Sequence, residues 1–316
     1  IESNSNGEPS VLLTPDMGLC KDCRHEITEP GNRRQGYPFT TCLKCGPRYS
    51  IIQGLPYDRP LTTMARFTMC PTCGKEYHDP SDRRFYSQTN SCPDCAVQLS
   101  LVTPDGKVLS TSASTIVEQA IAMFRQGAIL GVKGIGGYLL MTDASNISSV
   151  EELRYRKHRP SKPFAVLLKD LETARHYADI NESEATALQS LESPVVLVKR
   201  KNHSSLPCVA PGLDRLGIML PYTPLLALLA EGFNGPLVAT SGNISGSPIF
   251  YEDHQALNNL GGFADFFLVN NRDIVVPQDD SVVQYTRSGN QRIVLRRSRG
   301  MAPLVFHHPF NAEAPV

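Results

Sequence analysis

Eight of the nine cysteines form four Cys-x-x-Cys pairs, and 18 residues separate the two pairs of each set. This spacing is typical of zinc sites. Two thiolates that lie two residues apart on a tight turn can occupy adjacent corners of a tetrahedron, with zinc-to-sulfur distances of about 2.3 Å. Four thiolates leave no position open for water, so the sequence predicts two structural Zn²⁺ ions. The predicted ligands are Cys20, Cys23, Cys42 and Cys45 for the first ion, and Cys70, Cys73, Cys92 and Cys95 for the second.

The second cysteine set is the first one displaced by 50 residues, and the repeat continues beyond the ligands. Glu26 corresponds to Glu76, and the pair at 33–34 corresponds to the arginine pair at 83–84. The sequence therefore predicts two copies of one small zinc-ribbon-like unit, over residues 15–50 and 51–101. Few large apolar residues lie between the cysteines, so metal binding worth roughly 10 to 16 kcal/mol would replace the missing core.

Disulfides and nucleic-acid binding are the two alternatives for this segment. Disulfides need an oxidising compartment, and residues 1–10 have neither the basic nor the apolar region of a secretory signal. Residues 15–100 carry 11 Lys and Arg against 9 Asp and Glu, and each four-thiolate zinc site adds −2, which leaves a net charge of about −2. A phosphate-backbone binder needs uncompensated cations. We therefore expect the module to dock protein, although Arg33, Arg34, Arg83 and Arg84 could form a local basic patch.

Two polar segments further along could bind phosphate. Residues 154–162 hold five Lys and Arg, among them Lys157 and Arg159. Cations are common at helix C-termini because the helix dipole favours them there, but the prolines at 160 and 163 could also hold these side chains where they grip a triphosphate. The second segment is the loop at 240–246, where Ser241 and Asn243 could approach phosphate or ribose, or form an ordinary turn.

A glycine-rich segment at 131–138 suggests a dinucleotide fingerprint, but the pattern is not met. G-x-G-x-x-G requires glycine at position 139, which is Leu139, and no G-x-x-x-x-G-K-[ST] loop is present. The glycines could let the chain run close under a ligand, with Lys133 as a candidate contact, or their role could be purely structural.

The elements that must position these groups follow a turn at 104–106. Strand patterns at 128–132, 164–168, 195–199, 237–240, 266–269, 282–286 and 292–296 alternate with helix patterns at 149–156, 171–178, 182–191, 225–230 and 252–260. Thr115 and Glu118 fit a capping box that begins a further helix, which Gly127 would end. The alternation predicts one α/β domain with a twisted mixed sheet over residues 111–300.

The composition of the chain restricts the classes of protein to which it can belong. The chain has 316 residues, 31 Lys and Arg, 31 Asp and Glu, and 41% hydrophobic residues, which is typical of globular proteins and not of disordered chains. The longest apolar run, 225–230, is far shorter than the roughly 20 residues that cross a bilayer. We therefore expect no membrane association and a cytoplasmic location. The chain begins with Ile1, which predicts a processed chain or part of a longer one, with linkers at 1–14 and 301–316.

Taken together, the sequence resembles the central part of the HypF family of hydrogenase-maturation carbamoyltransferases. The order of tandem four-cysteine repeats followed by a YrdC-like domain is similar, as are the segments at 156–166, 209–217, 219–224, 279–283 and 296–300. YrdC-like domains carry K-x-R and S-x-N motifs that bind ATP. Lys157-x-Arg159 and Ser241-x-Asn243 fit these motifs, and Arg296 resembles an arginine near the end of that domain.

The resemblance implies an enzyme that uses ATP with Mg²⁺ and carbamoyl phosphate, from which carbamate is released. It implies carbamoyl-adenylate formation and carbamoyl transfer to the C-terminal cysteine of HypE, on the route to a cyanide ligand of nickel-iron hydrogenase. Lys157 and Arg159 would be catalytic and hold phosphates, Ser241, Asn243 and Arg296 would bind ATP, and Lys133 would contact the carbamoyl group. An acylphosphatase-like domain would precede the chain and a transfer domain would follow it, so the fragment would perform only the adenylation half-reaction.

Two other functions stay open. Threonylcarbamoyl-adenylate synthases of tRNA modification share the YrdC-like domain, but this chain has Met219 where they have an arginine and a glycine-rich stretch at 132–138 where they have P-T-E/D-T-x-Y-G-L. These departures favour a smaller carbamoyl group over threonine. The non-catalytic alternative is a zinc-ribbon adaptor that binds protein or RNA, which predicts no ATP binding.

Overall fold

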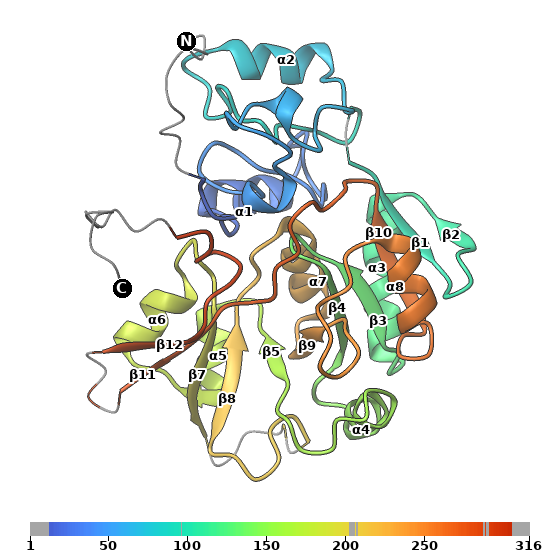
Figure 1. Ribbon diagram of the computed structural model, residues 1–316, viewed down its shortest axis with the longest axis vertical. Coiled ribbons are helices and arrows are strands. Elements are labelled where there is room, and N and C mark those ends of the chain that lie inside the picture. Colours follow the sequence, from blue (N-terminus) through green and yellow to red (C-terminus); the bar gives the residue numbers. More distant parts are fainter. Residues whose placement is uncertain are drawn as a thin grey trace, which may run out of the picture.

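The computed structural model describes residues 13–95, 97–201, 206, 208–286, 288 and 291–304. A twisted sheet of 12 strands forms its centre (Figure 1), in the order β12-β11-β7-β8-β5-β9-β4-β3-β10-β1-β2, with β6 paired to β7. The strands are β1 Leu99–Val102, β2 Val108–Ser110, β3 Leu130–Lys133, β4 Tyr138–Asp143, β5 Ala165–Leu167, β6 Ala178–Asp179, β7 Val195–Arg200, β8 Arg215–Met219, β9 Leu237–Ser241, β10 Phe266–Asn270, β11 Val282–Tyr285 and β12 Arg292–Arg296. The helices are α1 Lys21–Thr28, α2 Pro71–His78, α3 Ala113–Arg125, α4 Ile147–Arg156, α5 Leu171–Tyr177, α6 Glu182–Leu188, α7 Pro224–Phe233 and α8 Asp253–Leu260.

The sheet is mixed, as the sequence predicts. Strand β3 pairs in parallel with β10 and antiparallel with β4, and β8 pairs in parallel with β5 and antiparallel with β7. Every strand expected from the sequence is present, whereas β1, β2, β4, β6 and β8 were not expected. Strand β4 directly follows the glycine-rich segment and is buried along nearly its whole length, so it lacks the polar alternation that marks a half-exposed strand.

Alternate side chains of the central strands enter two separate cores, one on each face of the sheet. On β4, Tyr138 and Leu140 belong to the core that helices α4, α5, α6 and α8 cover. Leu139 and Met141 belong to the other core, which α3 and α7 cover. This two-sided burial is what an α/β architecture requires.

Helix α3 begins earlier than the sequence predicts. Its N-cap is Ser112, and the Thr115 hydroxyl donates a hydrogen bond to the Ser112 hydroxyl rather than capping the helix itself. The capping-box prediction is therefore wrong. The predicted helix end is correct, because Gly127 directly follows the last turn with φ of +85°, a conformation that favours glycine.

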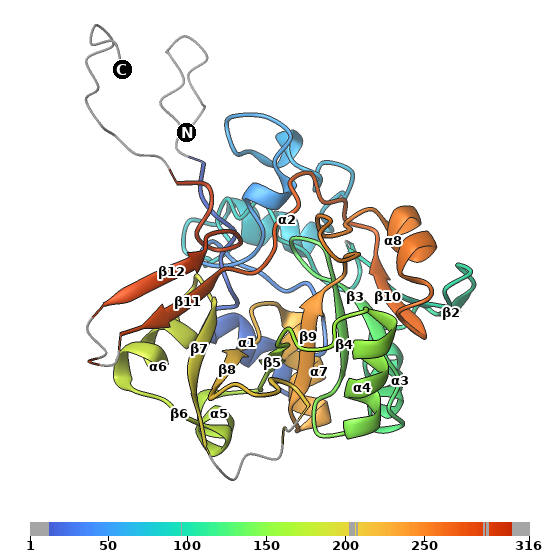
Figure 2. The same cartoon turned by 60° about the horizontal axis from the view of Figure 1, so that its bottom comes forward.

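The cysteine-rich segment lies against one end of the sheet domain. Its side chains Tyr37, Phe39, Ile51 and Met64 are buried in the same core as α3 and α7. Helix α1 lies beside α7 in both views (Figures 1 and 2). The segment therefore shares a hydrophobic core with the sheet. None of the helices in the described residues is long and apolar enough to span a bilayer.

Candidate functional site

The first four-cysteine group is built on a helix start and a tight turn. Cys20 is the N-cap of α1 and its sulfur accepts a hydrogen bond from the Cys23 amide, so both thiols face the same side. The pair at 42–45 reaches them from the next turn, with neighbouring sulfurs 3.5 to 3.8 Å apart. Sulfurs at 2.3 Å from a tetrahedral centre lie about 3.8 Å from one another. The donor set therefore fits a structural zinc ion.

The second group repeats this geometry. Cys70 is the N-cap of α2, and its sulfur accepts a hydrogen bond from the Cys73 amide. Neighbouring sulfurs, including those of the pair at 92–95, are 3.7 to 3.8 Å apart. All four ligand atoms of each group lie within 4.8 Å of one another. Both predicted cysteine sets therefore form compact sites that suit zinc.

The two repeats hold each other through reciprocal ion pairs. Arg33 and Arg34 of the first repeat pair with Glu76 of the second at 2.7 and 2.6 Å. Arg83 and Arg84 of the second repeat pair in the same way with Glu26 of the first. We call these contacts the cross-repeat clamps.

The clamps also reach the zinc-binding sulfurs. The Arg83 guanidinium donates to the Cys23 sulfur at 3.0 Å, and the Arg34 guanidinium donates to the Cys73 sulfur at 3.6 Å. Burial opposes ionisation of Glu76, but its hydrogen bonds with Arg34 and the charge of that arginine lower its pKa to about 2. These arginines offset the negative charge of each four-thiolate site. They do not form the basic patch that the sequence left open.

A second site lies on the sheet beside the cationic segment. Its cavity has a volume of about 320 Å³, and the apolar floor is made by β5, β7, β8 and β9. Gly217 lies in this floor, where an added Cβ would approach a Val195 methyl carbon to 3.1 Å. Arg159, Ser241 and Arg296 line the cavity. Residues from three distant parts of the chain, all predicted to bind nucleotide, therefore meet at one hollow.

Lys157 meets the loop after β9 but does not line this cavity. It is the C-cap of α4, and its ammonium donates to the main-chain oxygens of Ser241 and Asn243, both at 2.9 Å. A third hydrogen bond goes to the Asn243 side-chain oxygen at 3.1 Å, which also accepts from the Ser241 hydroxyl. All three ammonium hydrogens thus have acceptors in the loop. Burial, together with the nearby Arg159, lowers the pKa of Lys157 to about 8.

Arg159 presents a positive charge to the cavity. Its guanidinium donates to the Thr240 hydroxyl at 3.2 Å and lies 5.0 Å from the centre of the Phe164 ring. Burial, with the charges of Arg154 and Arg296, lowers its pKa to about 10. A half-buried cation beside other cations is costly, and an anionic ligand would offset this cost.

Asp279 is a cavity residue that the sequence patterns did not indicate. Its carboxylate pairs with Arg296 at 3.0 Å and faces the hollow, and burial raises its pKa. The sequence feature that could have indicated it is the pair of adjacent aspartates at 279–280, in a segment that resembles the HypF family. The neighbouring Asp280 instead pairs with Arg299, at 2.9 Å.

Lys133 lies apart from the other predicted site residues. It is buried at the end of β3, where its ammonium donates to the Asn270 main-chain oxygen and pairs with Asp253 at 2.6 Å. The glycines that follow bring the chain close to other backbone. A Cβ on Gly136 would lie 2.2 Å from the main-chain oxygen of Gln278.

Comparisons with known proteins match both parts of the chain. The family of Sua5, YciO and YrdC proteins, described as telomere recombination, matches residues 122–298. The HypF finger matches residues 19–52 and again 69–102. Both four-cysteine groups fall within the finger matches, and the cavity residues fall within the other.

Similar proteins extend these matches over nearly the whole chain. Carbamoyltransferase HypF of Rhodobacter capsulatus is 47% identical over 92% of this chain, which spans 38% of that protein. The crystal structure of full-length HypF in the phosphate- and nucleotide-bound form has a TM-score of 0.86 at 43% identity, covering 92% of this chain and 37% of that one. Human threonylcarbamoyl-AMP synthase is 29% identical over 40% of this chain and 46% of its own length. The chain thus spans less than two-fifths of its HypF relatives and matches the synthase only distantly.

Proposed function

We propose, on the premise that this chain belongs to the Sua5/YciO/YrdC family and carries two HypF fingers, that it catalyses formation of carbamoyl-adenylate from ATP and carbamate. A carbamate oxygen attacks the α-phosphorus of ATP, the bond to the β-phosphate oxygen breaks, and pyrophosphate leaves. The observation that carries the proposal is the meeting of Arg159, Ser241 and Arg296 at one cavity. Its volume of about 320 Å³ is in the range of small-ligand sites.

Some cavity residues position the nucleotide, and others neutralise its charge. The apolar floor around Gly217 accepts the flat base or the ribose, and Arg159 and Arg296 neutralise charge that develops on the phosphate oxygens. Lys157 acts by holding residues 241–243 in place, so that Ser241 stays at the cavity wall. In this proposal Lys157 is a positioning residue, and Arg159 is the catalytic group.

Mg²⁺ with ATP is part of the proposal, because adenylation releases a highly charged pyrophosphate. Asp279 supplies the carboxylate oxygen at the cavity that suits this hard cation. When bound, the metal neutralises phosphate charge. The zinc ions have no part in the chemistry, since four thiolates leave no open position.

The wider role follows from the HypF relatives. In this proposal carbamoyl phosphate supplies the carbamate through an acylphosphatase-like domain, and a C-terminal domain transfers the carbamoyl group to the terminal cysteine of HypE. We also propose a cytoplasmic location, because free thiols that bind zinc need a reducing compartment. In this proposal Lys133 contacts the carbamoyl group, which requires its ammonium to leave the ion pair with Asp253 when substrate binds.

Exchange of labelled pyrophosphate into ATP, with freshly dissolved ammonium carbamate, tests the reaction. We expect carbamate-dependent exchange that Arg159→Gln abolishes, with two zinc ions retained per chain. Arg156→Gln is the matched control, because Arg156 pairs with Glu152 and Asp265 outside the cavity. AMP formation with threonine and bicarbonate, but not with carbamate, would identify a threonylcarbamoyl-adenylate synthase instead. Absence of ATP binding would favour the adaptor.

A further inference from the structure

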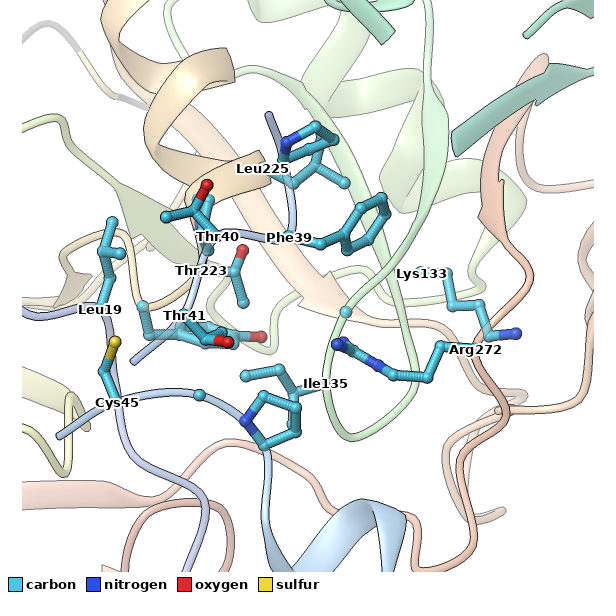
Figure 3. A pocket seen from close by; sticks show the side chains of 16 residues that line it. Leu19, Phe39, Thr40, Thr41, Cys45, Lys133, Ile135, Thr223, Leu225 and Arg272 are labelled. Carbon is cyan, nitrogen blue, oxygen red and sulfur yellow. The ribbon is translucent and has the colours of Figure 1, made fainter. Parts of the chain in front are cut away.

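A second, smaller cavity lies between the first zinc repeat and the sheet (Figure 3). Residues 38–41 and 45–47 form one wall, and residues 133–135 and 222–225 form the other. The lining is largely apolar, and the space within which the centres of bound atoms can lie is about 20 Å³. The cavity exists only because the repeat docks on the sheet, and it shares no lining residue with the larger cavity.

Arg272 directs a positive charge into this hollow. Its exposed fraction is only 7%, and Figure 3 shows its guanidinium pointing toward Ile135 and the centre of the cavity. Within the part of the chain that the structure describes, this guanidinium donates no hydrogen bond, and its aromatic contact is the Phe39 ring at 5.7 Å. Lys133 lines the same cavity, but its ammonium points away toward Asn270 and Asp253.

The nearby carboxylate does not pair with this arginine. Asp16 accepts hydrogen bonds from the amides of Arg48 and Ser50 and from the Gln278 side chain. A largely buried guanidinium without a hydrogen-bonded partner is unfavourable, and an anion in the cavity would offset this cost.

The start of helix α7 adds to the positive potential. Thr223, Pro224 and Leu225 line the cavity at the N-terminus of this helix, where the dipole favours anions. The Thr223 side chain accepts from the Leu226 amide, and Pro224 has no amide hydrogen. The first-turn amide left for a ligand is that of Leu225.

The size of the cavity restricts the anion. In a planar one-carbon anion, the three outer atoms lie about 1.2 to 1.3 Å from the central carbon. Such an anion fits the small cavity, whereas carbamoyl phosphate or a nucleotide is too large for it. We propose that this cavity binds a planar one-carbon oxyanion of the bicarbonate and carbamate class, with Arg272 as its counter-ion. Carbamate is also the substrate in the proposed function. The assignment of carbamate, as distinct from bicarbonate, to this cavity rests on that proposed function.

Three side chains in contact connect this site to the larger cavity. Tyr222 lines the small cavity, and its ring lies 3.5 Å beneath the Arg299 guanidinium. Arg299 in turn pairs with Asp280, which lines the larger cavity. These contacts connect the lining of the small cavity with that of the larger one.

Thermal unfolding of the zinc-loaded chain without nucleotide tests the site. We expect a saturable rise of the midpoint with sodium bicarbonate but not with sodium chloride at equal ionic strength, and none with the larger sulfate. Fresh ammonium carbamate, compared with ammonium bicarbonate, distinguishes the two sources. No saturable response to either anion would overturn the proposal, whatever the outcome of the pyrophosphate exchange.

Arg272→Gln should weaken bicarbonate binding at least tenfold while zinc content and affinity for an ATP analogue stay unchanged. The matched control Arg66→Gln removes an exposed arginine that pairs with Asp273 and should bind as the parent does. Leu225→Phe narrows the cavity and leaves the guanidinium in place, so it should also lose the response. An unchanged response in either cavity variant would contradict the site.

Discussion

The Lys157 ammonium donates two hydrogen bonds to Asn243, which lies 86 residues later in the chain: one to its main-chain oxygen at 2.9 Å and one to its side-chain oxygen at 3.1 Å. The sequence predicts that the K-x-R and S-x-N motifs each contact the nucleotide. In the structure the lysine of the first motif binds the asparagine of the second. The cation at 157 shapes the loop, and the loop in turn presents Ser241 to the cavity.

Lys157→Met should therefore weaken nucleotide binding through the loop. Each of the three lost hydrogen bonds is worth about 0.5 to 1.5 kcal/mol, so the dissociation constant of a non-hydrolysable ATP analogue should rise roughly tenfold or more. Titration calorimetry measures this change, with Arg156→Gln as control. If the variant bound as tightly as the parent, the loop would not depend on this lysine.

The pKa of Lys157 predicts proton uptake on nucleotide binding. Burial lowers this pKa to about 8 from the model-peptide value of 10.5, so between pH 8 and 10.5 the unfolded chain binds more protons here than the folded one. The contribution of this group to the free energy of unfolding consequently rises with pH across that window. Nearby phosphates should raise the pKa again, so calorimetry at pH 9 in buffers of different ionisation enthalpy should record proton uptake. The uptake should disappear in Lys157→Met.

Asp279→Asn should separate metal binding from nucleotide binding. The carboxylate is the group we assign to Mg²⁺, so the half-saturating Mg²⁺ concentration for pyrophosphate exchange should rise severalfold. Binding of the metal-free nucleotide should change little or strengthen, because Arg296 loses its carboxylate partner. Asp105→Asn, in an exposed turn, is the control. A Mg²⁺ dependence equal to that of the parent would reject the assignment.

The cross-repeat clamps should stabilise the zinc module far more than an exposed ion pair does. The Arg34 side chain is only 2% exposed, so Glu76→Gln leaves a buried cation without its carboxylate partner and should cost about 3 to 5 kcal/mol. Asp273→Asn breaks the Arg66–Asp273 pair, whose side chains are 47% and 63% exposed, and should cost about 1 kcal/mol or less. Urea unfolding of both variants, with zinc release to a chelator followed in parallel, measures the difference. Equal costs would mean that Arg34 finds another acceptor.

Removal of zinc should destabilise the sheet as well as the zinc module. Tyr37 and Phe39 of the first repeat are buried in the core that α3 and α7 cover, so collapse of this repeat exposes that core. Cys23→Ser, or chelation of the parent, should lower the midpoint of the whole chain in one transition, which near-ultraviolet circular dichroism can follow. A separate low-temperature transition with an unchanged main midpoint would show that the repeats and the sheet unfold independently.

The sequence determined the elements whose chemistry is local. Cys-x-x-Cys pairs at fixed separation specify a tetrahedral thiolate site whatever surrounds them, and apolar periodicity indicated each of the seven expected strands, because burial on a sheet leaves a pattern in consecutive residues. The K-x-R and S-x-N motifs were likewise visible as residues of the right type. The structure shows that Arg159, Ser241 and Arg296 line one cavity, and their role in nucleotide binding stays a prediction.

Only the tertiary structure decided which group each charged side chain meets. Lys133 pairs with Asp253, and the arginines at 33–34 and 83–84 pair across the repeats. No sequence pattern marks Arg272, yet among the described residues its largely buried guanidinium, between the first repeat and the sheet, has no hydrogen-bonded partner. Charge pairing depends on distances of a few ångströms between residues far apart in the chain, and local sequence patterns carry no information about such distances.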